Sequence, residues 1–264
     1  MSCRKCIKIA NEEFCTRCGA FLIDSYKRVV RERKFLDRPQ ADTGEILSNL
    51  RLRQHKIRYF PANYTTERPL LVDFIFEQGQ ESGLCSLTRH ISVFLMDYVH
   101  SLSDIPTVLF KSVALSCILI ASKSEQSEKI PQIQDYPTNI KSIELEVLSI
   151  LNWKLHVSTV LHFIQFYSTV GFILEDEVED VRCVGIARKF AVFLCELCIG
   201  ECRFAKVFPE ELAICCLAAG RKKAGVRDVW AEELVRLTHK VPDSELLEDI
   251  MKFYHLNFPE TRNE

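Results

Sequence analysis

Three segments between residues 68 and 153 decide the fold. They are Arg68-Pro-Leu-Leu-Val-Asp-Phe74, Ala121-Ser-Lys-Ser-Glu125 and Ile143-Glu-Leu-Glu-Val-Leu-Ser-Ile-Leu-Asn-Trp153. The first and last carry apolar side chains at helical spacing, and the second ends an apolar run. Each alone is typical of an ordinary amphipathic helix, so their order and separation carry the information. Together they predict a helical binding module in the middle of the chain.

Helical patterns also fill the rest of the chain after residue 43. Period-2 alternation and the Asn-Gly or Asp-Gly turns of β-hairpins are absent beyond residue 20. We therefore predict an all-α fold. The expected helices cover 43–56, 66–81, 87–101, 107–123, 138–152, 158–170, 177–199, 209–221, 229–239 and 243–256.

Two uncharged segments rich in small residues, Ser112–Ser122 and Leu212–Ala219, predict central helices that other helices surround. Each is preceded by an amphipathic segment and followed by cations. The repeated pattern predicts two five-helix bundles in tandem. The domain limits that follow are 43–156, 157–258 and a tail at 259–264.

The composition predicts a folded chain in which the part after residue 60 does not bind nucleic acid. Of its 264 residues, 47% are hydrophobic, enough to bury a sizeable core. The first 60 residues hold 14 Lys and Arg against 7 Asp and Glu, so the net charge of −2 leaves the remainder near −9. An acidic body does not neutralise phosphates, which supply most of the affinity for nucleic acid.

We also expect no membrane partner. Ser112–Ser122 is far shorter than the roughly 20 residues that cross a bilayer. Leu155–Leu174 is long enough, but its polar residues and helical apolar spacing favour one buried face. No apolar segment follows Met1, so we expect no secretory signal and reduced thiols.

The order of the motifs resembles the cyclin box, the fold that binds and activates cyclin-dependent protein kinases. Arg68–Phe74 looks like the start of its first helix and His90–Asp97 like its second. In cyclins the Asp of the second helix pairs with that Arg, so the resemblance implies a structural ion pair between Arg68 and Asp97. Without the resemblance to cyclins, Arg68 and Asp97 would both be interpreted as solvated surface charges. Residues 187–213 are similar to the C-terminal cyclin fold.

The resemblance also implies a kinase-binding surface. Lys123 and Glu144 stand where cyclins contact the kinase beside its mobile regulatory helix, and the expected kinase-binding residues also include Ser124, Glu125 and Leu148. Taken alone, Lys123 is a cation favourable to a helix C-terminus, and Glu144 is an ordinary surface residue. Ser124 departs from the bulky residue usual at its position.

A second implied site is the hydrophobic patch through which some cyclins recruit substrates. Here it would use Leu70, Phe74 and Glu77. Glu67 replaces its leading apolar residue, and Lys111 stands where a neutral polar residue is usual. These departures argue against substrate docking there.

Four cysteines near the N-terminus predict a structural zinc site. Cys3, Cys6, Cys15 and Cys18 form two Cys-x2-Cys pairs followed by Gly19. Two such pairs supply the four thiolates of a tetrahedral site, and residues 1–20 resemble a short zinc ribbon. Because all four positions on the zinc would be occupied by protein thiolates, no position is left for a reactive water, and a catalytic zinc is not expected. Unliganded or redox-active thiols are the alternative. Most other cysteines sit among apolar neighbours, where a free thiol packs as a small hydrophobe.

Residues 21–42 form a basic linker. Its run Lys27–Lys34 suits nuclear import, and Arg33–Leu36 matches a short destruction signal. We expect a location in the nucleus, the cytoplasm or both.

The sequence thus predicts a regulatory subunit that binds and activates a cyclin-dependent protein kinase catalytic subunit. No catalytic triad or phosphate-binding glycine loop is present, so we expect no enzyme activity and no small-molecule substrate. Two alternatives remain open. Transcription initiation factor IIB also has a zinc ribbon before two cyclin-like folds, but that adaptor needs a basic body. The second alternative is a cyclin-fold scaffold that has lost its kinase, and the small side chain of Ser124 at a usual contact position is the feature that most favours it.

Overall fold

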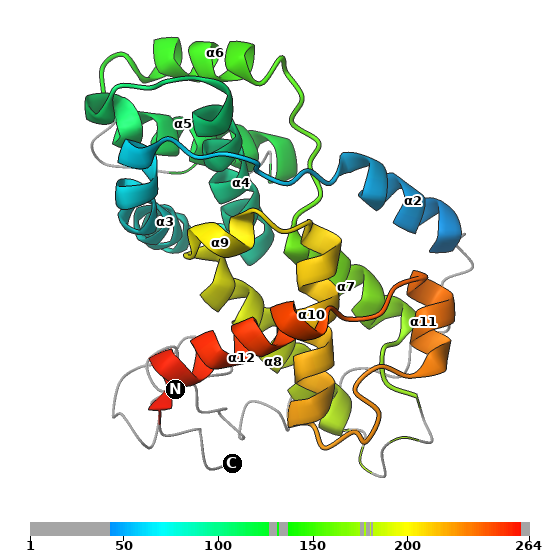
Figure 1. The fold of residues 1–264 in the computed structure, drawn as a ribbon. Helices are drawn as coiled ribbons and strands as arrows, with labels where there is room; N and C mark the ends of the chain where they lie inside the picture. Colours follow the sequence, from blue (N-terminus) through cyan, green and yellow to red (C-terminus); the bar gives the residue numbers. More distant parts are fainter. Residues whose placement is uncertain are drawn as a thin grey trace. The chain divides into compact units, whose positions relative to one another are not determined.

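The computed structural model describes residues 43–126, 131, 137–174, 177, 180 and 182–259. Every regular element in these ranges is helical (Figure 1), which confirms the predicted all-α class. The zinc-ribbon-like unit at 1–20 and the basic linker at 21–42 lie outside the described residues, as do most of the residues of the predicted tail.

The helices agree with the expected ranges to within a few residues at most ends, and a short extra helix, α9, was not predicted. Their bounds are α2 Thr43–Arg53, α3 Ala62–Glu81, α4 Ser86–Leu102, the 3-10 turn η1 Thr107–Leu109, α5 Phe110–Glu125, α6 Ile140–Ile150, α7 Val160–Val170, α8 Arg182–Ile199, α9 Cys202–Ala205, α10 Pro209–Lys223, α11 Glu232–Thr238 and α12 Ser244–Asn257.

The chain divides into two compact units. The first comprises Thr43–Tyr167 and Val192–Ile214, and the second includes Ser168–Ala191 and Cys215–Glu264. Helices α7, α8 and α10 therefore contribute residues to both units. The predicted domain limits at 43–156 and 157–258 stay a prediction.

Helix α5 forms the centre of the first unit. Every side chain from Val113 to Ser122 is buried, and α3, α4 and α6 pack against the helix. This confirms the predicted central helix. Among the described helices, Thr107–Glu125 alone is long and apolar enough to cross a membrane, but 61% of that window is buried inside the fold. Such burial is typical of a core helix.

Helix α3 begins at Ala62, four residues before its predicted start, so Pro69 lies inside the helix and not in its first turn. A proline has no N–H, and one inside a helix leaves the carbonyl four residues earlier without its usual donor. That carbonyl belongs to Thr65, and the Cys202 thiol donates to it at 3.8 Å. The longer helix tolerates the proline because another donor reaches the freed carbonyl.

In the second unit, α8 and α10 approach each other at a glycine. A Cβ atom added to Gly220 would lie 2.3 Å from the carbonyl oxygen of Ala187, so only glycine allows this separation. Beside it, Arg221 is fully buried and its Nη1 donates to Glu177 Oε2 at 2.9 Å. The sequence suggested only a cation following a helix at this position.

Candidate functional site

Lys123 and Glu144 form an ion pair at the surface of the first unit. Lys123 lies in the last turn of α5 and Glu144 in α6, and Lys123 Nζ lies 2.5 Å from Glu144 Oε1. The side chains are 49% and 15% exposed. Because α5 and α6 pack together through their apolar faces, the fold holds these two opposite charges at one place on its surface.

The predicted neighbours of this pair differ in their accessibility. Ser124 and Glu125 are exposed, and the Ser124 hydroxyl donates to Glu125 Oε1 at 3.4 Å. Leu148 belongs to the hydrophobic core of the unit and is only 8% exposed. The structure therefore brings Lys123, Ser124 and Glu125 to the surface with Glu144 beside them, whereas Leu148 chiefly supports α6 from within.

Two exposed apolar side chains on α6 and its C-terminal end were missed from the sequence. Leu145, next to Glu144, is 58% exposed, and Trp153 is 64% exposed. Leu145 follows Glu144 directly, but consecutive positions on a helix do not share a face, so the sequence alone did not indicate its exposure. Trp153 follows the C-terminal end of α6, where Asn152 and Trp153 both have positive φ, and no sequence pattern indicated its exposure.

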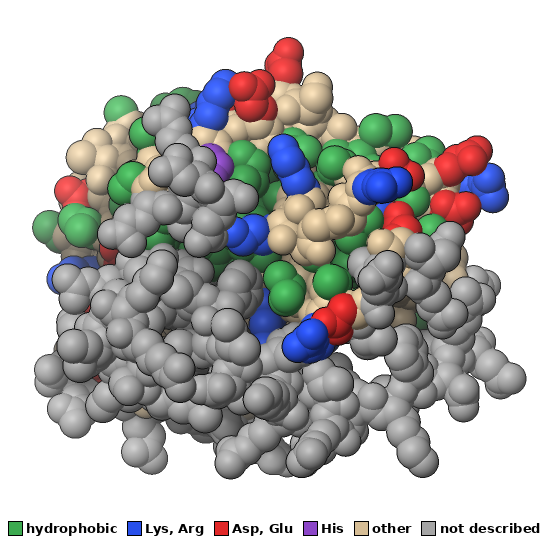
Figure 2. Space-filling model, turned by 90° about the horizontal axis from the view of Figure 1, so that it is seen from below, with side chains coloured by type: hydrophobic (Ala, Val, Ile, Leu, Met, Phe, Trp, Pro, Cys, Tyr) green, Lys and Arg blue, Asp and Glu red, His purple; other side chains and the backbone are tan. Residues whose placement is uncertain are grey.

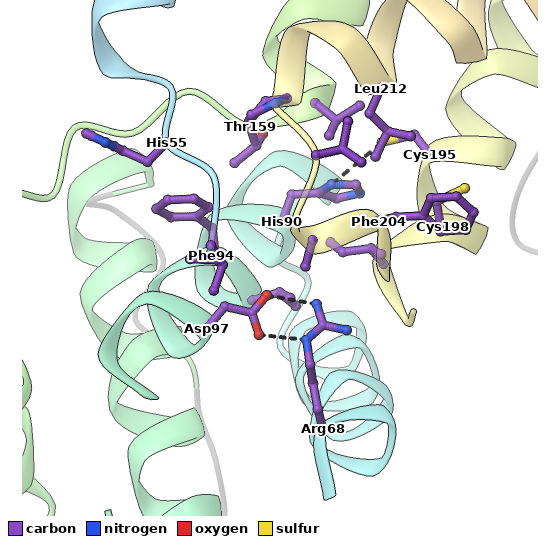
Figure 3. A pocket seen from close by; sticks show the side chains of 17 residues that line it. His55, Arg68, His90, Phe94, Asp97, Thr159, Cys195, Cys198, Phe204 and Leu212 are labelled. Atoms are coloured by element: carbon purple, nitrogen blue, oxygen red, sulfur yellow. Dashed lines mark hydrogen bonds and ion pairs between the residues drawn. The ribbon is translucent and has the colours of Figure 1, made fainter. Parts of the chain in front are cut away.

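Arg68 and Asp97 form a buried, bidentate ion pair between α3 and α4, shown in Figure 3. Arg68 Nε donates to Asp97 Oδ1 and Nη2 donates to Oδ2, both at 2.7 Å. Tyr64 donates its hydroxyl to Asp97 Oδ1 at 2.6 Å, and Arg68 Nη1 donates to the Gly200 carbonyl at 2.9 Å. The arginine is 1% and the aspartate 3% exposed, so the alternative of two solvated charges does not describe this pair.

The pKa shifts in this network follow from burial and from the aspartate. Burial acts to lower the pKa of Arg68, but the charge and the hydrogen bonds of Asp97 outweigh it and raise the pKa above its ordinary value. Burial, and then the negative charge of Asp97, raises the pKa of Tyr64 well above its usual range. Both groups therefore keep their protons, and the network joins α3 and α4 rather than moving protons.

A small cavity of about 60 Å³ lies beside this pair, also within the first unit. Figure 3 shows His90 among its lining residues, with Nδ1 of His90 3.9 Å from the Cys195 sulfur. Burial, and then the charge of Arg89, lowers the pKa of His90 to about 3. The imidazole is thus neutral near pH 7, and no group of three or more metal-ligating side chains occurs among the described residues.

The predicted docking patch on α3 is only partly apolar. Leu70 is 67% exposed and Glu77 is exposed, whereas Phe74 is half-buried. The ammonium group of Lys111 lies 5.9 Å from the centre of the Phe74 ring. A cation over the ring face reduces the apolar surface available to a ligand, in line with the departures seen in the sequence.

The predicted zinc ligands Cys3, Cys6, Cys15 and Cys18 and the motif at Arg33–Leu36 lie outside the described residues. On the face drawn in Figure 2, acidic and basic side chains of the described residues lie next to one another. That part of the surface has the mixed charge of a solvated face.

Comparison with known proteins gives two family matches that together span most of the chain. The family described as "Cyclin, N-terminal domain" matches residues 45–156, and "Cyclin, C-terminal domain" matches residues 158–263.

Several curated proteins are similar over about two thirds of the chain. Cyclin-J of Xenopus laevis is 27% identical over 193 residues, which cover 65% of this chain and 50% of the relative. Cyclin-J of Homo sapiens is 26% identical over 189 residues, covering 65% and 49%. Cyclin-D of Ostreococcus tauri is 26% identical over 191 residues, covering 66% and 51%. The chain spans about half the length of these relatives.

Proposed function

Because the chain belongs to the cyclin family, we propose that it is a regulatory subunit that binds and activates a cyclin-dependent protein kinase. Cyclins are regulatory subunits and do not catalyse the phosphoryl transfer themselves. The proposal assigns the Lys123–Glu144 pair to the contact with the catalytic subunit.

The single observation that supports the proposal is the position of this ion pair. Lys123 directly follows the buried segment Val113–Ser122 of α5, and Glu144 meets it from the adjacent helix. A cation and an anion on a rigid surface offer a donor and an acceptor to an incoming helix. Hydrogen bonds to charged groups are about twice as strong as neutral ones.

The mechanism follows from what a kinase requires. Phosphoryl transfer needs a strand lysine paired with a glutamate on the regulatory helix of the kinase, together with an ordered activation loop. A rigid partner that binds only the inward position of this helix shifts the population toward it. A shift from 1:99 to 99:1 requires about 5.5 kcal/mol of differential affinity. An interface of the usual size, about 1,600 Å², could supply that difference if it forms only with the inward position of the helix.

A scaffold role without a kinase remains the second candidate, and Ser124 favours it. This exposed serine stands where a bulky contact residue is usual in cyclins. A lost anchor at that position would weaken the contact with a standard catalytic subunit. Binding measurements separate the two functions directly.

The test uses the full chain and a panel of purified cyclin-dependent kinase catalytic subunits, with binding and peptide phosphorylation both measured. We expect one subunit to bind and to become active. The double variant Lys123→Glu with Glu144→Lys keeps two opposite charges beside each other but exchanges their places. It should abolish activation while the helical circular dichroism signal stays unchanged. Full activation by this variant would contradict the assignment, and a panel without any binder would favour the scaffold.

We also propose that the N-terminal cysteines hold one structural zinc ion. The spacing of Cys3, Cys6, Cys15 and Cys18 supports this proposal. The ion would stabilise the zinc-ribbon-like unit at residues 1–20 and would take no part in phosphoryl transfer.

A further inference from the structure

The cavity beside the Arg68–Asp97 pair has no part in the proposed kinase contact. Its lining residues come from the segment between α2 and α3 and from α3, α4 and α7–α10, all within the first unit, and they include neither Lys123 nor Glu144. Its volume of about 60 Å³ exceeds the roughly 10–15 Å³ that one water requires and is below the roughly 150 Å³ of a cavity that binds benzene. The space therefore fits one small side chain.

The imidazole of His90 brings an unused hydrogen-bonding atom to this cavity. Figure 3 shows His90 among the lining residues; its side chain is 2% exposed, and its Nε2 has no hydrogen-bond partner among the described residues. The other ring nitrogen, Nδ1, lies 3.9 Å from the Cys195 sulfur. Burial raises the pKa of the Cys195 thiol well above its ordinary value, so the sulfur keeps its proton and can donate it to Nδ1. Nε2 then carries the proton of the neutral ring and acts as a donor.

The walls of the cavity determine which acceptor suits this donor. They are mainly apolar, with side chains such as Ile57, Val93 and Leu212. A carboxylate among these walls would lose its hydration and gain a single hydrogen bond, whereas a hydroxyl or amide oxygen loses much less. A buried donor without a partner is itself costly, so an acceptor oxygen that reaches Nε2 is favoured. The cavity therefore suits a small side chain with an uncharged acceptor oxygen, such as threonine or asparagine.

The rim of the cavity is cationic. Lys56 and Phe208 each stand between two lining residues in the sequence, and Lys56 Nζ lies 4.9 Å from the centre of the Phe208 ring. The carbonyl of Arg53 accepts a hydrogen bond from Ser158 N at 3.0 Å, next to the lining residue Thr159. Arg53 and Lys56 are exposed, and neither forms an ion pair within the described part of the chain. Such unpaired cations attract negatively charged groups of a partner.

We propose that this cavity and its rim form a docking site for a short acidic segment of a partner protein. The segment inserts one small side chain with an uncharged acceptor oxygen, which accepts a hydrogen bond from His90 Nε2. Its carboxylates lie over Arg53 and Lys56, so the charges of the two surfaces are complementary. The site goes beyond the proposed function and does not depend on a kinase.

The test selects short peptides from a random displayed library on the full chain and measures the enriched peptides by calorimetric titration. Lys56→Glu reverses a charge at the rim, and because Lys56 is exposed the fold should not change. His90→Phe removes the donor and keeps a ring. The matched control is Lys141→Glu, since Lys141 is an exposed lysine of the same unit that does not line the cavity. A thermal melt of each variant checks that it is folded.

We expect the enriched peptides to carry Asp and Glu on both sides of a threonine or asparagine. Lys56→Glu and His90→Phe should each raise Kd by at least about fivefold, and Lys141→Glu should change it less than about twofold. Added salt should weaken binding, because it screens the attraction between the peptide and the exposed cations.

The remaining outcomes overturn the proposal at separate steps. Failure to enrich acidic peptides, or a Kd that Lys56→Glu leaves unchanged, would remove the docking site. Equal binding to folded His90→Phe would show that no side chain enters the cavity. A single-stranded DNA oligonucleotide is titrated in parallel, and if it binds more tightly than the peptides and loses affinity in Lys56→Glu, the rim belongs to nucleic acid. None of these results bears on the kinase contact at Lys123 and Glu144.

Discussion

The Arg68 guanidinium and the Asp97 carboxylate meet through two parallel hydrogen bonds of 2.7 Å, and both side chains are almost completely buried. A bidentate pair of this kind gives each carboxylate oxygen of Asp97 a hydrogen-bond donor at a favourable geometry. The pair joins α3 to α4, and these two helices cover the central helix α5. Its loss should therefore affect the whole first unit.

We expect Asp97→Ala to destabilise the protein by about 3–5 kcal/mol, because it leaves the Arg68 charge buried without its partner. The unfolding free energy from urea titration measures the effect. The control is Arg236→Ala, which breaks an exposed pair with Glu232 and should leave stability nearly unchanged. Equal small effects of both variants would show that Asp97 is not buried in solution.

The Lys123–Glu144 pair should contribute little to stability. Lys123 is about half exposed, so solvent screens the attraction and the pair contributes no more than about 1 kcal/mol. Lys123→Glu places two anions together and should lower the urea midpoint slightly, and the exchange with Glu144→Lys should restore it. A large loss of stability in the exchanged variant would mean that failed activation reports misfolding and not a lost contact.

Stability should fall in mild acid because two histidines are buried in neutral form. Burial lowers the pKa of His90 to about 3, and burial lowers that of His100 to about 4, from an ordinary 6.5. The unfolded chain therefore binds protons that the folded chain does not. The stability from these groups is complete above about pH 6.5 and is lost as the pH falls toward 4, by about 1.4 kcal/mol per pH unit for each histidine.

Urea titrations at pH 7.5, 6, 5 and 4 measure this slope. His90→Phe removes one titrating group from the interior and should make the dependence shallower. An unchanged slope in this variant would show that His90 already takes up a proton in the folded protein or is accessible to water.

Gly220→Ala should destabilise the second unit by more than about 2 kcal/mol. Its Cβ would lie 2.3 Å from the Ala187 carbonyl oxygen, and backbone atoms move less easily than side chains. Gly200→Ala is the matched control, since the nearest atom to its Cβ is 3.9 Å away. A thermal melt distinguishes the two. Similar midpoints would show that α8 and α10 lie farther apart than described.

The zinc proposal predicts one zinc ion per chain, measured by elemental analysis after dialysis. Replacing Cys3 and Cys18 by serine should abolish it, because each Cys-x2-Cys pair loses one thiolate. Cys85→Ser is the control, since Cys85 is an exposed free thiol outside the motif. Absence of zinc in the unchanged chain, purified without chelators, would contradict the site.

The sequence predicted much of the fold because helical periodicity is long and regular here. The uncharged segment at Ser112–Ser122, apolar on all sides, predicted a buried helix, and the described structure buries all of Val113–Ser122. The resemblance to cyclins supplied the pairing of Arg68 with Asp97. The burial of Arg68 cannot be inferred from its local sequence, because its partner Asp97 lies 29 positions away.

Other features depend on tertiary contacts that a local pattern does not contain. Helix α3 runs through Pro69 because a distant thiol reaches the Thr65 carbonyl. The sequence indicated only that Arg221 is a cation following an apolar segment, and its burial against the Glu177 carboxylate and the Asp228 carbonyl depends on contacts distant in sequence. Trp153 is exposed at a helix end where Asn152 and Trp153 both have positive φ, and no sequence pattern indicates that conformation.

The mutual neutralisation of Lys123 and Glu144 has a consequence for molecular encounters. Two opposite charges 2.5 Å apart produce a dipolar field that decays quickly with distance. A partner arriving from solution would feel little long-range steering from this spot, so its capture would depend on collisions in the right orientation. Under the proposed function, recognition there would operate at close range, where shape and apolar surface decide the outcome.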